Sequence, residues 1–232
     1  MFNSKDKILI IAAHPDDEVI GCGGTILKAK ALGSKVSVIF LGEGVSTRFH
    51  NHELGAKSLK AKKIRENESK KCLKILGIKD YKFGSLLCTS FDDYPLVKIV
   101  RIIESKINDF KPSIIFTHNE NEINIDHTIT HKAVEIACRY LKGDYLKSIY
   151  SFEVICSANL RFKNKFYPNV YVNIKKYWKK KIFAFKAYKT EIRKYPHPRS
   201  IRGLEILAKY RGLQSNQEYS EAFKLEKSFV RN

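Results

Sequence analysis

The sequence predicts an α/β fold with a mostly parallel sheet, and three observations lead to this prediction. Short runs that are wholly apolar, as at residues 8–13, or nearly so, as at 36–41, are typical of parallel strands buried on both faces. Amphipathic segments of helical length alternate with these runs, as they do in βαβ units. The chain of 232 residues is long enough for one large domain, and it shows no linker, repeat or low-complexity segment. We therefore expect a single domain over residues 1–232.

The expected elements follow the chain in order. Residues 8–13 form the first strand, which Pro15 ends because proline has no N–H to donate to a neighbouring strand. An amphipathic helix then covers residues 18–31, and Gly33 supplies its C-terminal cap. The remaining elements are strands at 36–41, 81–83, 113–117, 148–154 and 169–174, and helices at about 54–76, 95–110, 126–141, 177–189 and 201–210.

Three glycines lie inside the first helix, at positions 21, 23 and 24. A glycine-rich dinucleotide-binding turn is the main alternative for them. That motif needs its glycines before the helix, where the backbone meets a pyrophosphate, but Asp16 and Asp17 occupy that place and would repel phosphate. We therefore expect the glycines to allow close packing of the helix on the sheet.

Polar side chains follow the first strand directly, among them His14, Asp16 and Asp17. The carboxyl end of a central strand is where open α/β sheets place their ligands. Imidazole and carboxylate groups together form a ligand set for a divalent metal, and zinc suits it well. The alternative is a turn that ends in a helix N-cap, with acidic side chains at the positive end of the helix dipole. Taken alone, the cluster is equally compatible with both interpretations.

A second polar cluster, residues 118–127, leaves the end of another buried strand and favours the metal site. His127 and His131 are spaced i,i+4 and share a helix face. Only the first turn of that helix points at the strand ends, so we expect His127 alone to be a ligand. Asp126 is either the N-cap of the helix or an acceptor that fixes the tautomer of a ligand imidazole.

The formal net charge of +19 indicates either an anionic partner or a lysine-rich surface that keeps the protein in solution. The lysines are spread along the whole chain, which favours the second interpretation, and the run 175–181 is a local exception. The five cysteines show no Cys-x-x-Cys spacing, and neither a signal peptide nor a membrane-spanning segment is visible. We therefore expect a cytoplasmic protein with reduced cysteines, and peripheral contact with a membrane stays open.

Taken together, these residues resemble the LmbE-like, or PIG-L, family of zinc-dependent N-acetyl-sugar deacetylases. The most specific match is Ala13-His14-Pro15-Asp16-Asp17-Glu18, which continues to Thr25. Further matches follow in order along nearly the whole chain: Arg65-x-x-Glu68, Thr117-His118, Asn124-Ile125-Asp126-His127, Phe152-Glu153, Phe166-Tyr167-Pro168-Asn169, His197-Pro198-Arg199-Ser200, Arg211-Gly212 and Glu221-Ala222-Phe223.

The resemblance implies a Rossmann-like three-layer sandwich with helices on both faces of the sheet. It also implies one zinc ion per chain, held by His14, Asp17 and His127, and a general base at Asp16; another divalent metal is compatible with the same donors. Three protein ligands leave a position for water, whose pKa the metal lowers. Asp16 would take the proton of that water as it attacks the acetamide carbonyl.

One position departs from the family pattern. Many family members have a histidine where this chain has Asn124, and that histidine is given an acid or oxyanion-stabilising role. Asn124 can donate a hydrogen bond but cannot supply a proton at neutral pH. Either Asp16 acts as both base and acid, or another residue supplies the proton. His197, which lies between two prolines, is the candidate, and a plain turn histidine is the alternative.

These observations predict a zinc-dependent N-deacetylase that removes acetate from an amino sugar of the N-acetylglucosamine type, nucleotide- or lipid-linked, in surface-glycan synthesis. Arg48, Arg65, Arg199 and His197 lie in segments expected near the mouth of the site, which predicts an anionic substrate, since arginine grips phosphate with its planar fork. Ion pairing with Glu68 is the alternative role for Arg65, and loop anchoring is the alternative for Arg199.

Two other functions remain as alternatives. The first is a zinc amidohydrolase that acts on a non-sugar acylated amine. The reaction of zinc-activated water with an amide does not depend on the rest of the substrate, so the site residues alone do not exclude it. The second, weaker alternative is a basic nucleic-acid-binding protein with a Rossmann-like core. No nucleic-acid-binding motif supports it, so we expect no nucleic-acid partner.

Overall fold

A computed structural model describes residues 2–49, 55–141, 143–158 and 160–230 of the chain. Within these residues, seven strands form one sheet in the order β3-β2-β1-β4-β5-β7-β6. Strands β1 to β5 pair in parallel, whereas β7 pairs antiparallel with both β5 and β6. The strands are β1 (Lys7–Ala12), β2 (Lys35–Gly42), β3 (Asp80–Leu86), β4 (Ile114–His118), β5 (Ser148–Phe152), β6 (Val170–Asn173) and β7 (Ser220–Ser228).

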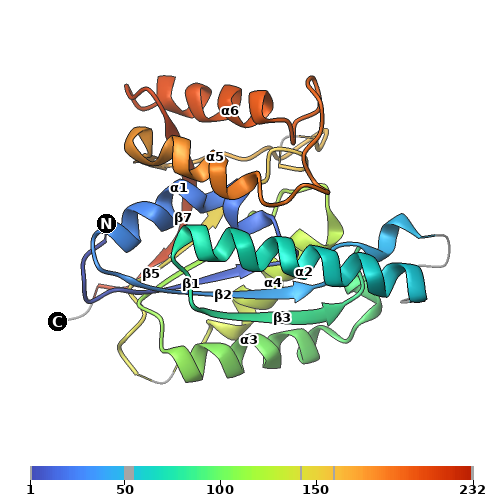
Figure 1. Cartoon of the computed structure of the whole chain (residues 1–232). Helices are drawn as coiled ribbons and strands as arrows, with labels where there is room; N and C mark the ends of the chain where they lie inside the picture. Colours follow the sequence, from blue (N-terminus) through green and yellow to red (C-terminus); the bar gives the residue numbers. More distant parts are fainter. Residues whose placement is uncertain (1, 50–54, 142, 159, 231–232) are drawn as a thin grey trace.

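Helices cover both faces of the sheet (Figure 1). Helices α1, α2 and α5 lie on one face, α3 and α4 lie on the other, and α6 lies outside α5. The α-helices are α1 (Asp17–Ala31), α2 (Ala56–Leu76), α3 (Leu96–Phe110), α4 (Ile125–Ala137), α5 (Trp178–Phe185) and α6 (Ile201–Leu213), and three short 3-10 helices are η1 (Ser46–Arg48), η2 (Phe91–Asp93) and η3 (Lys175–Tyr177). The predicted α/β fold, a layered sandwich with a mostly parallel sheet, is confirmed.

Strand β1 explains how one apolar run serves two cores. Its side chains alternate, so that Ile8 and Ile10 pack with α1, α2 and α5, whereas Leu9 and Ile11 pack with α3 and α4. Both faces of the strand are covered. A polar side chain at any position in this run would therefore be removed from water, which costs free energy.

Strands β1 and β4 lie side by side, and their outer neighbours extend the sheet in opposite directions. Strand β1 continues to β2 and β3, while β4 continues to β5. Such a reversal of strand order opens a crevice at the carboxyl ends of the two strands, which is where α/β sheets bind ligands. The two polar clusters of the sequence follow these two strands, so the fold brings them to the same crevice.

The glycines of α1 allow the close packing predicted for them. A Cβ atom at Gly21 would collide with the ring of Phe152, and one at Gly24 would lie 2.7 Å from Cγ2 of Ile174. Helix α1 therefore approaches β5 and the segment after β6 more closely than any larger residue at these positions would permit.

The structure differs from the prediction mainly near the C-terminus. Strand β7 was not predicted, although it lies between β5 and β6 inside the sheet. Helix α5 ends at Phe185 rather than near Lys189, because the chain turns there to bring Thr190 to the side chain of Glu68 on α2. Helix α4 ends at Ala137, four residues earlier than expected. Over the described part of the chain, no helix has both the length and the apolar character needed to cross a membrane.

Candidate metal centre

The turn after β1 carries the first polar cluster to the carboxyl edge of the sheet. Ala13 donates its N–H to Nε2 of His118 over 2.9 Å, which ties the ends of β1 and β4 together. Asp16 then adopts φ 125°, a conformation that costs a residue with a side chain free energy, and donates its N–H to Oε2 of Glu18 over 2.9 Å. The Asp16 carboxylate makes no capping hydrogen bond to α1, so the N-cap interpretation does not hold for it.

The side chains of His14, Asp17 and His127 converge in the crevice, and all three are buried. Oδ2 of Asp17 lies 3.6 Å from Nδ1 of His14 and 3.5 Å from Nε2 of His127. Nε2 of His127 is buried and has no hydrogen-bond partner among the described residues. An unpaired buried polar atom is costly unless another group binds it. Two imidazoles and a carboxylate at this spacing therefore fit a divalent cation, and zinc in particular.

A carboxylate holds the far nitrogen of each of these imidazoles. Nε2 of His14 lies 2.7 Å from Oδ2 of Asp126, and Nδ1 of His127 is hydrogen-bonded to Oε2 of Glu122. When the far nitrogens carry the protons, Nδ1 of His14 and Nε2 of His127 keep the lone pairs that a metal needs. This arrangement matches the tautomer-fixing alternative for Asp126. The N-cap alternative is wrong, because the side chain of Asn124 caps α4 by accepting the Asp126 N–H over 2.9 Å.

The Asp126 carboxylate also holds the segment that follows β3. Its Oδ2 accepts the N–H of Thr89 over 2.5 Å, and its Oδ1 accepts the N–H of Phe91 over 3.1 Å. One buried side chain thus connects the start of α4, the His14 imidazole and the backbone at the opposite side of the crevice.

His118 and Glu122 support His127 from behind, a role that sequence reasoning did not assign to them. The rings of His118 and His127 stack with centroids 3.9 Å apart. Glu122 accepts the N–H of Val154 over 2.9 Å and the hydroxyl of Ser157 over 2.5 Å, so its carboxylate is fixed as well as buried. Both residues belong to the second polar cluster, and His118 also belongs to the Thr117-His118 match to the family.

Two other groups of donor atoms are equally compact: His14 with Cys88 and Asp126, and His118 with Glu122 and His127. In each of them, two members are already hydrogen-bonded to one another. The group formed by His14, Asp17 and His127 includes the unpaired Nε2 atom, so it is the best candidate for holding a cation.

An open pocket of about 560 Å³, solvent at its mouth included, leads to these side chains. The three candidate ligands form its floor together with Asp16, and its walls come from the segments after β2, β3, β4 and β5. The residues of these walls include Gly44, Thr47, Cys88, Thr89, Asn124 and Cys156. Two of the five cysteines, Cys88 and Cys156, thus line the pocket.

Three arginines converge on the buried carboxylate of Glu191 at the edge of this pocket. Arg48 places Nη2 2.7 Å from both of its oxygens, and Arg199 places Nη1 2.7 Å from Oε2. Arg65 is hydrogen-bonded to Oε1 and also donates to the carbonyl oxygen of Pro15 over 2.7 Å. Glu191 was not predicted, and its single negative charge offsets only part of the charge of the three guanidinium groups.

The same contacts reach Asp16 and exclude one alternative. Nη1 of Arg199 lies 3.3 Å from Oδ2 of Asp16, and Nη1 of Arg65 lies 3.9 Å from the same atom. Pairing with Glu68, one turn along α2, was the alternative role for Arg65. That alternative is wrong, because Glu68 accepts hydrogen bonds from Thr190 and Arg65 turns toward Glu191.

The geometry can now be compared with known proteins. The family model described as "PIG-L: GlcNAc-PI de-N-acetylase" matches residues 9–138, which run from β1 through α4 and include all three candidate ligands. The chain belongs to the PIG-L family. The resemblance inferred from the sequence motifs is thereby confirmed.

Relatives of this PIG-L chain are distant in sequence. A "Probable N-acetyl-alpha-D-glucosaminyl L-malate deacetylase 2" of Bacillus anthracis is 25% identical over 185 residues, which are 79% of this chain and 80% of that protein. The structure of N,N'-diacetylchitobiose deacetylase from Pyrococcus horikoshii has a TM-score of 0.72 at 20% identity, over 95% of this chain and 83% of that one. GalB, a 4-carboxy-2-hydroxymuconate hydratase from Pseudomonas putida KT2440, has a TM-score of 0.75 at 18% identity, over 98% of each chain. The two structural similarities show the fold alone.

In this PIG-L chain, four of the other predicted site residues line the pocket and one does not. Asn124, Arg48, Arg65 and Arg199 line the pocket. His197 does not line it. That residue is exposed, and its Nδ1 accepts the N–H of Arg199 over 3.0 Å, which is the arrangement of a turn histidine.

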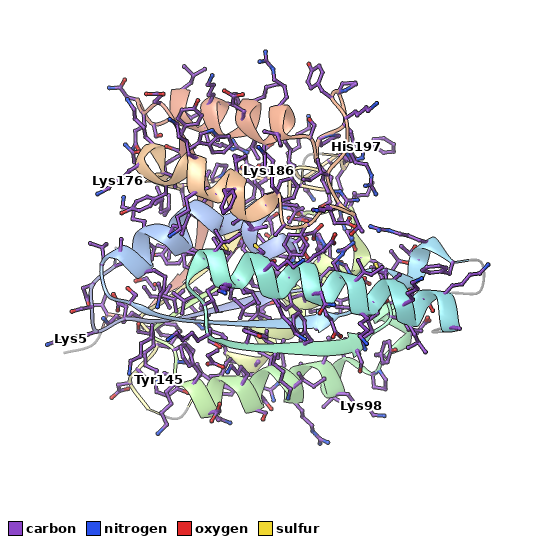
Figure 2. The ribbon with its side chains drawn as sticks, in the orientation of Figure 1. Lys5, Lys98, Tyr145, Lys176, Lys186 and His197 are labelled. Carbon is purple, nitrogen blue, oxygen red and sulfur yellow. The ribbon has the colours of Figure 1, made fainter. Side chains whose placement is uncertain are left out.

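His131, which was expected not to be a ligand, belongs to none of the donor groups found in the described residues. Its Nδ1 lies 2.9 Å from the carbonyl oxygen of His118. Figure 2 shows His197 at the outer surface and the labelled lysines Lys5, Lys98 and Lys176 on different sides of the molecule. The positive charge of this chain is therefore not concentrated around the pocket.

The two adjacent aspartates of the PIG-L motif have opposite electrostatic environments. Burial, together with the nearby Asp17 charge, raises the pKa of Asp16 to about 8, although Arg65 opposes the rise. Burial would also raise the pKa of Asp17, but the His127 and His118 imidazoles hold it well below its ordinary value. Burial lowers the pKa of His127 to about 4, which keeps its imidazole neutral and able to bind a metal.

Proposed function

We propose that this protein is a zinc-dependent N-deacetylase that hydrolyses the acetamide of an N-acetylglucosamine-type sugar, with residues 1–232 acting as one deacetylase domain. The observation that carries the proposal is the convergence of Nδ1 of His14, Oδ2 of Asp17 and the unpaired Nε2 of His127 at the end of a pocket. The deacetylase names of the relatives support the reaction class.

His14, Asp17 and His127 would hold the metal, one ion per chain. When bound, zinc acts as a Lewis acid that polarises the acetamide carbonyl and lowers the pKa of water. Asp126 and Glu122 keep the two imidazoles in the tautomers that this role needs. Three protein donors leave room for substrate and water, as a catalytic rather than structural site requires.

Asp16 is the general base in this proposal. Its carboxylate lines the pocket beside the ligands without capping α1, and in its ionised form it can accept a proton from the attacking water. Its backbone is held by Glu18 and its side chain lies beside the guanidinium of Arg199, which keeps the carboxylate in one orientation. The same side chain then returns the proton to the leaving amine, because His197 lies outside the pocket lining.

Asn124 orients the scissile amide. Asn124 lines the pocket and its Oδ1 accepts the N–H of Asp126, so Nδ2 is the group that would donate to the carbonyl oxygen of the substrate. This donor would stabilise the negative charge that develops on that oxygen, although it cannot supply a proton.

The substrate is proposed to carry an anionic group beyond the sugar, as in a nucleotide- or lipid-linked intermediate of surface-glycan synthesis. Arg48 is the arginine best placed to meet such a group, because its side chain is 36% exposed at the pocket mouth. Arg65 is 2% exposed and bound to Glu191 and Pro15, so it serves to build the wall rather than to reach substrate.

The test is to measure released acetate from N-acetylglucosamine presented free, nucleotide-linked and lipid-linked, together with the metal content of the purified protein. We expect about one zinc per chain, and acetate release that a chelator abolishes and added zinc restores. Full activity in protein stripped of metal would refute the proposal. Metal binding without acetate release from any sugar would favour an acylated amine that is not a sugar.

A further inference from the structure

Residues 160–165, between β5 and β6, form an exposed tip that mixes apolar and basic side chains. We call this segment the basic tip. Phe162 is 104% exposed and Leu160 is 54% exposed. Arg161, Lys163 and Lys165 are exposed beside them. A fully exposed phenylalanine next to another exposed apolar side chain gains nothing from the fold, so a binding role is the natural explanation.

The base of this tip is firmly held, so its exposure is built into the fold. Phe166 is 3% exposed and packs with Ala158 and Ala222, while the guanidinium of Arg211 lies 5.5 Å from the centre of its ring. At the other end, Arg161 donates Nε–H to the carbonyl oxygen of Glu122 over 3.0 Å. Phe162, Lys163 and Lys165 lie between these anchors, and Leu160 directly precedes Arg161; all four side chains are exposed.

The basic tip lies on the same edge of the molecule as the pocket. The N–H of Ile123 donates to the carbonyl oxygen of Ser157 over 3.1 Å, which joins the loop after β4 to the segment that leads into the tip. Ile123 is 55% exposed and Ile125 is 40% exposed, and Asn124 between them lines the pocket. Exposed apolar side chains from two separate loops thus flank one side of the pocket mouth.

The chain segment that contains the basic tip carries charge of one sign. Between Glu153 and Glu191 the sequence contains no aspartate or glutamate, although it contains Lys and Arg throughout. The basic tip therefore presents its three cations with no acidic neighbour along its own chain. A surface of this kind complements an anionic one.

From these observations we propose that the basic tip binds an anionic lipid bilayer, with Phe162 and Leu160 inserted at the headgroup level and Arg161, Lys163 and Lys165 facing the lipid phosphates. The proposal goes beyond the deacetylation reaction and does not depend on it. Basic side chains around protruding apolar ones are the pattern of peripheral membrane binding, in which charge attraction and apolar burial add together.

The side-chain chemistry favours a bilayer over a nucleic acid. Leucine and isoleucine have no aromatic face on which a base can stack, and only one aromatic ring stands at the tip. Aliphatic side chains do gain free energy by leaving water for the acyl region of a membrane. Bound in this way, the protein would present its pocket mouth to the membrane surface.

The test is co-sedimentation of the full chain with vesicles of phosphatidylcholine alone and of phosphatidylcholine mixed with phosphatidylglycerol in equal parts. We expect binding to the anionic vesicles only, reversed by salt. The variant Lys163→Ala/Lys165→Ala should bind roughly 25-fold more weakly, since each basic side chain near an anionic surface contributes about fivefold. Phe162→Ala should lower the partition coefficient by about tenfold or more, as the loss of one buried aromatic side chain predicts.

The matched controls lie elsewhere on the surface. Tyr140→Ala removes an aromatic side chain that is 89% exposed beyond the opposite end of α4, and Lys5→Ala/Lys98→Ala removes two distant exposed lysines (Figure 2). These controls should bind the vesicles as the unmodified protein does.

Each other outcome would overturn the proposal. Equal losses in the control and tip variants would show that net charge alone binds the vesicles. Equal binding to neutral vesicles, or none to anionic ones, would exclude an anionic bilayer as the partner. Tighter binding to a single-stranded oligonucleotide at the same salt, lost in the tip variants, would assign the tip to nucleic acid. An unchanged unfolding midpoint in every variant ensures that these results report on the surface.

Discussion

Nε2 of His14 and Oδ2 of Asp126 lie 2.7 Å apart, although 112 residues separate them in the sequence. Both residues are buried, so the hydrogen bond between them is shielded from water. It leaves Nδ1 as the nitrogen of His14 that faces Asp17 and His127. The orientation of the first candidate ligand is therefore set by a residue from the second polar cluster.

Replacing Asp126 with asparagine should weaken zinc binding by about 10- to 100-fold, because an amide is a poorer acceptor for the imidazole N–H than a carboxylate. The measurement is the dissociation constant obtained by competition with a chelator. Asp109→Asn, which changes a carboxylate that is 80% exposed on α3, is the control and should leave the affinity as it is. Equal affinities for the Asp126 variant and the unmodified protein would contradict this account.

Replacement of Asp16 and replacement of Asp17 should impair the protein in different ways. Asp17→Ala should lose the metal, because it removes a ligand atom, whereas Asp16→Asn should keep the metal and lose about 10²- to 10⁴-fold in turnover, because it removes only the base. Metal analysis and acetate release, measured on the same samples, separate the two effects. Loss of zinc to the same extent in both variants would show that the assignment of roles is wrong.

Glu191 should govern stability in acid. Burial would raise the pKa of Glu191, but the guanidinium of Arg65, with Arg48 and Arg199, lowers it below its ordinary value of 4.5. A lowered folded-state pKa adds stability above pH 4.5 and loses it as the pH falls through the folded-state value. Denaturant unfolding between about pH 3 and 6 should therefore show a steep loss of stability that Glu191→Gln flattens.

The size of the effect at neutral pH provides a second check on Glu191. Its replacement by glutamine leaves the buried guanidinium of Arg65 without its charge partner, which should cost about 3–5 kcal/mol. Glu205→Gln is the control, because its partner Lys209 is 52% exposed, and such surface pairs contribute less than about 1 kcal/mol. A loss of similar size in both variants would mean that the arginine cluster is not held by Glu191.

Gly24→Ala should destabilise the protein by about 1–3 kcal/mol, because the added methyl group meets Ile174 at 2.7 Å inside the core. Gly55→Ala is the matched control, since nothing lies within 4 Å of a Cβ atom there. Its effect should stay below about 1 kcal/mol, the usual scale at a helix N-cap. Urea unfolding of both variants gives the comparison. A neutral Gly24 variant would show that α1 can move away from the sheet at little cost.

An anionic substrate should be steered by charge at the pocket mouth. We expect kcat/KM for a phosphorylated acetamido sugar to fall as ionic strength rises, whereas that for the neutral sugar should change little. Arg48→Ala should reduce the salt dependence for the anionic substrate, because it removes the most exposed guanidinium of the pocket. The opposite result, equal efficiency on both sugars with no salt effect, would assign the positive charge to another role.

The strands that carry the site could be predicted because burial alone determines which residue types they contain. Strands β1 and β2 are covered on both faces, so their sequences are continuous apolar runs with an unambiguous signal. Strand β7 was not predicted because its second half is rich in charged residues and partly exposed. There, Lys224 pairs with Glu120. A partly exposed strand of this kind looks like a polar loop when only the sequence is considered.

The site itself was predictable where its residues are adjacent in sequence, and not where the fold assembles them. His14, Asp16 and Asp17 follow one strand, and His127 was recognised through the second cluster. Glu191 lies in an irregular segment far from both clusters, and its burial against three arginines follows only from tertiary packing.

Asp126 connects the metal centre to two backbone amides whose hydrogen exchange can be measured. The amides of Thr89 and Phe91 donate to the same carboxylate that holds His14, so their protection from exchange depends on how firmly that carboxylate is held. A cation bound to His14 would restrain Asp126 as well, so we expect both amides to exchange faster when the cation is removed. Hydrogen–deuterium exchange at these two positions in the backbone therefore serves as a gauge of metal occupancy that needs neither a substrate nor a spectroscopically visible ion.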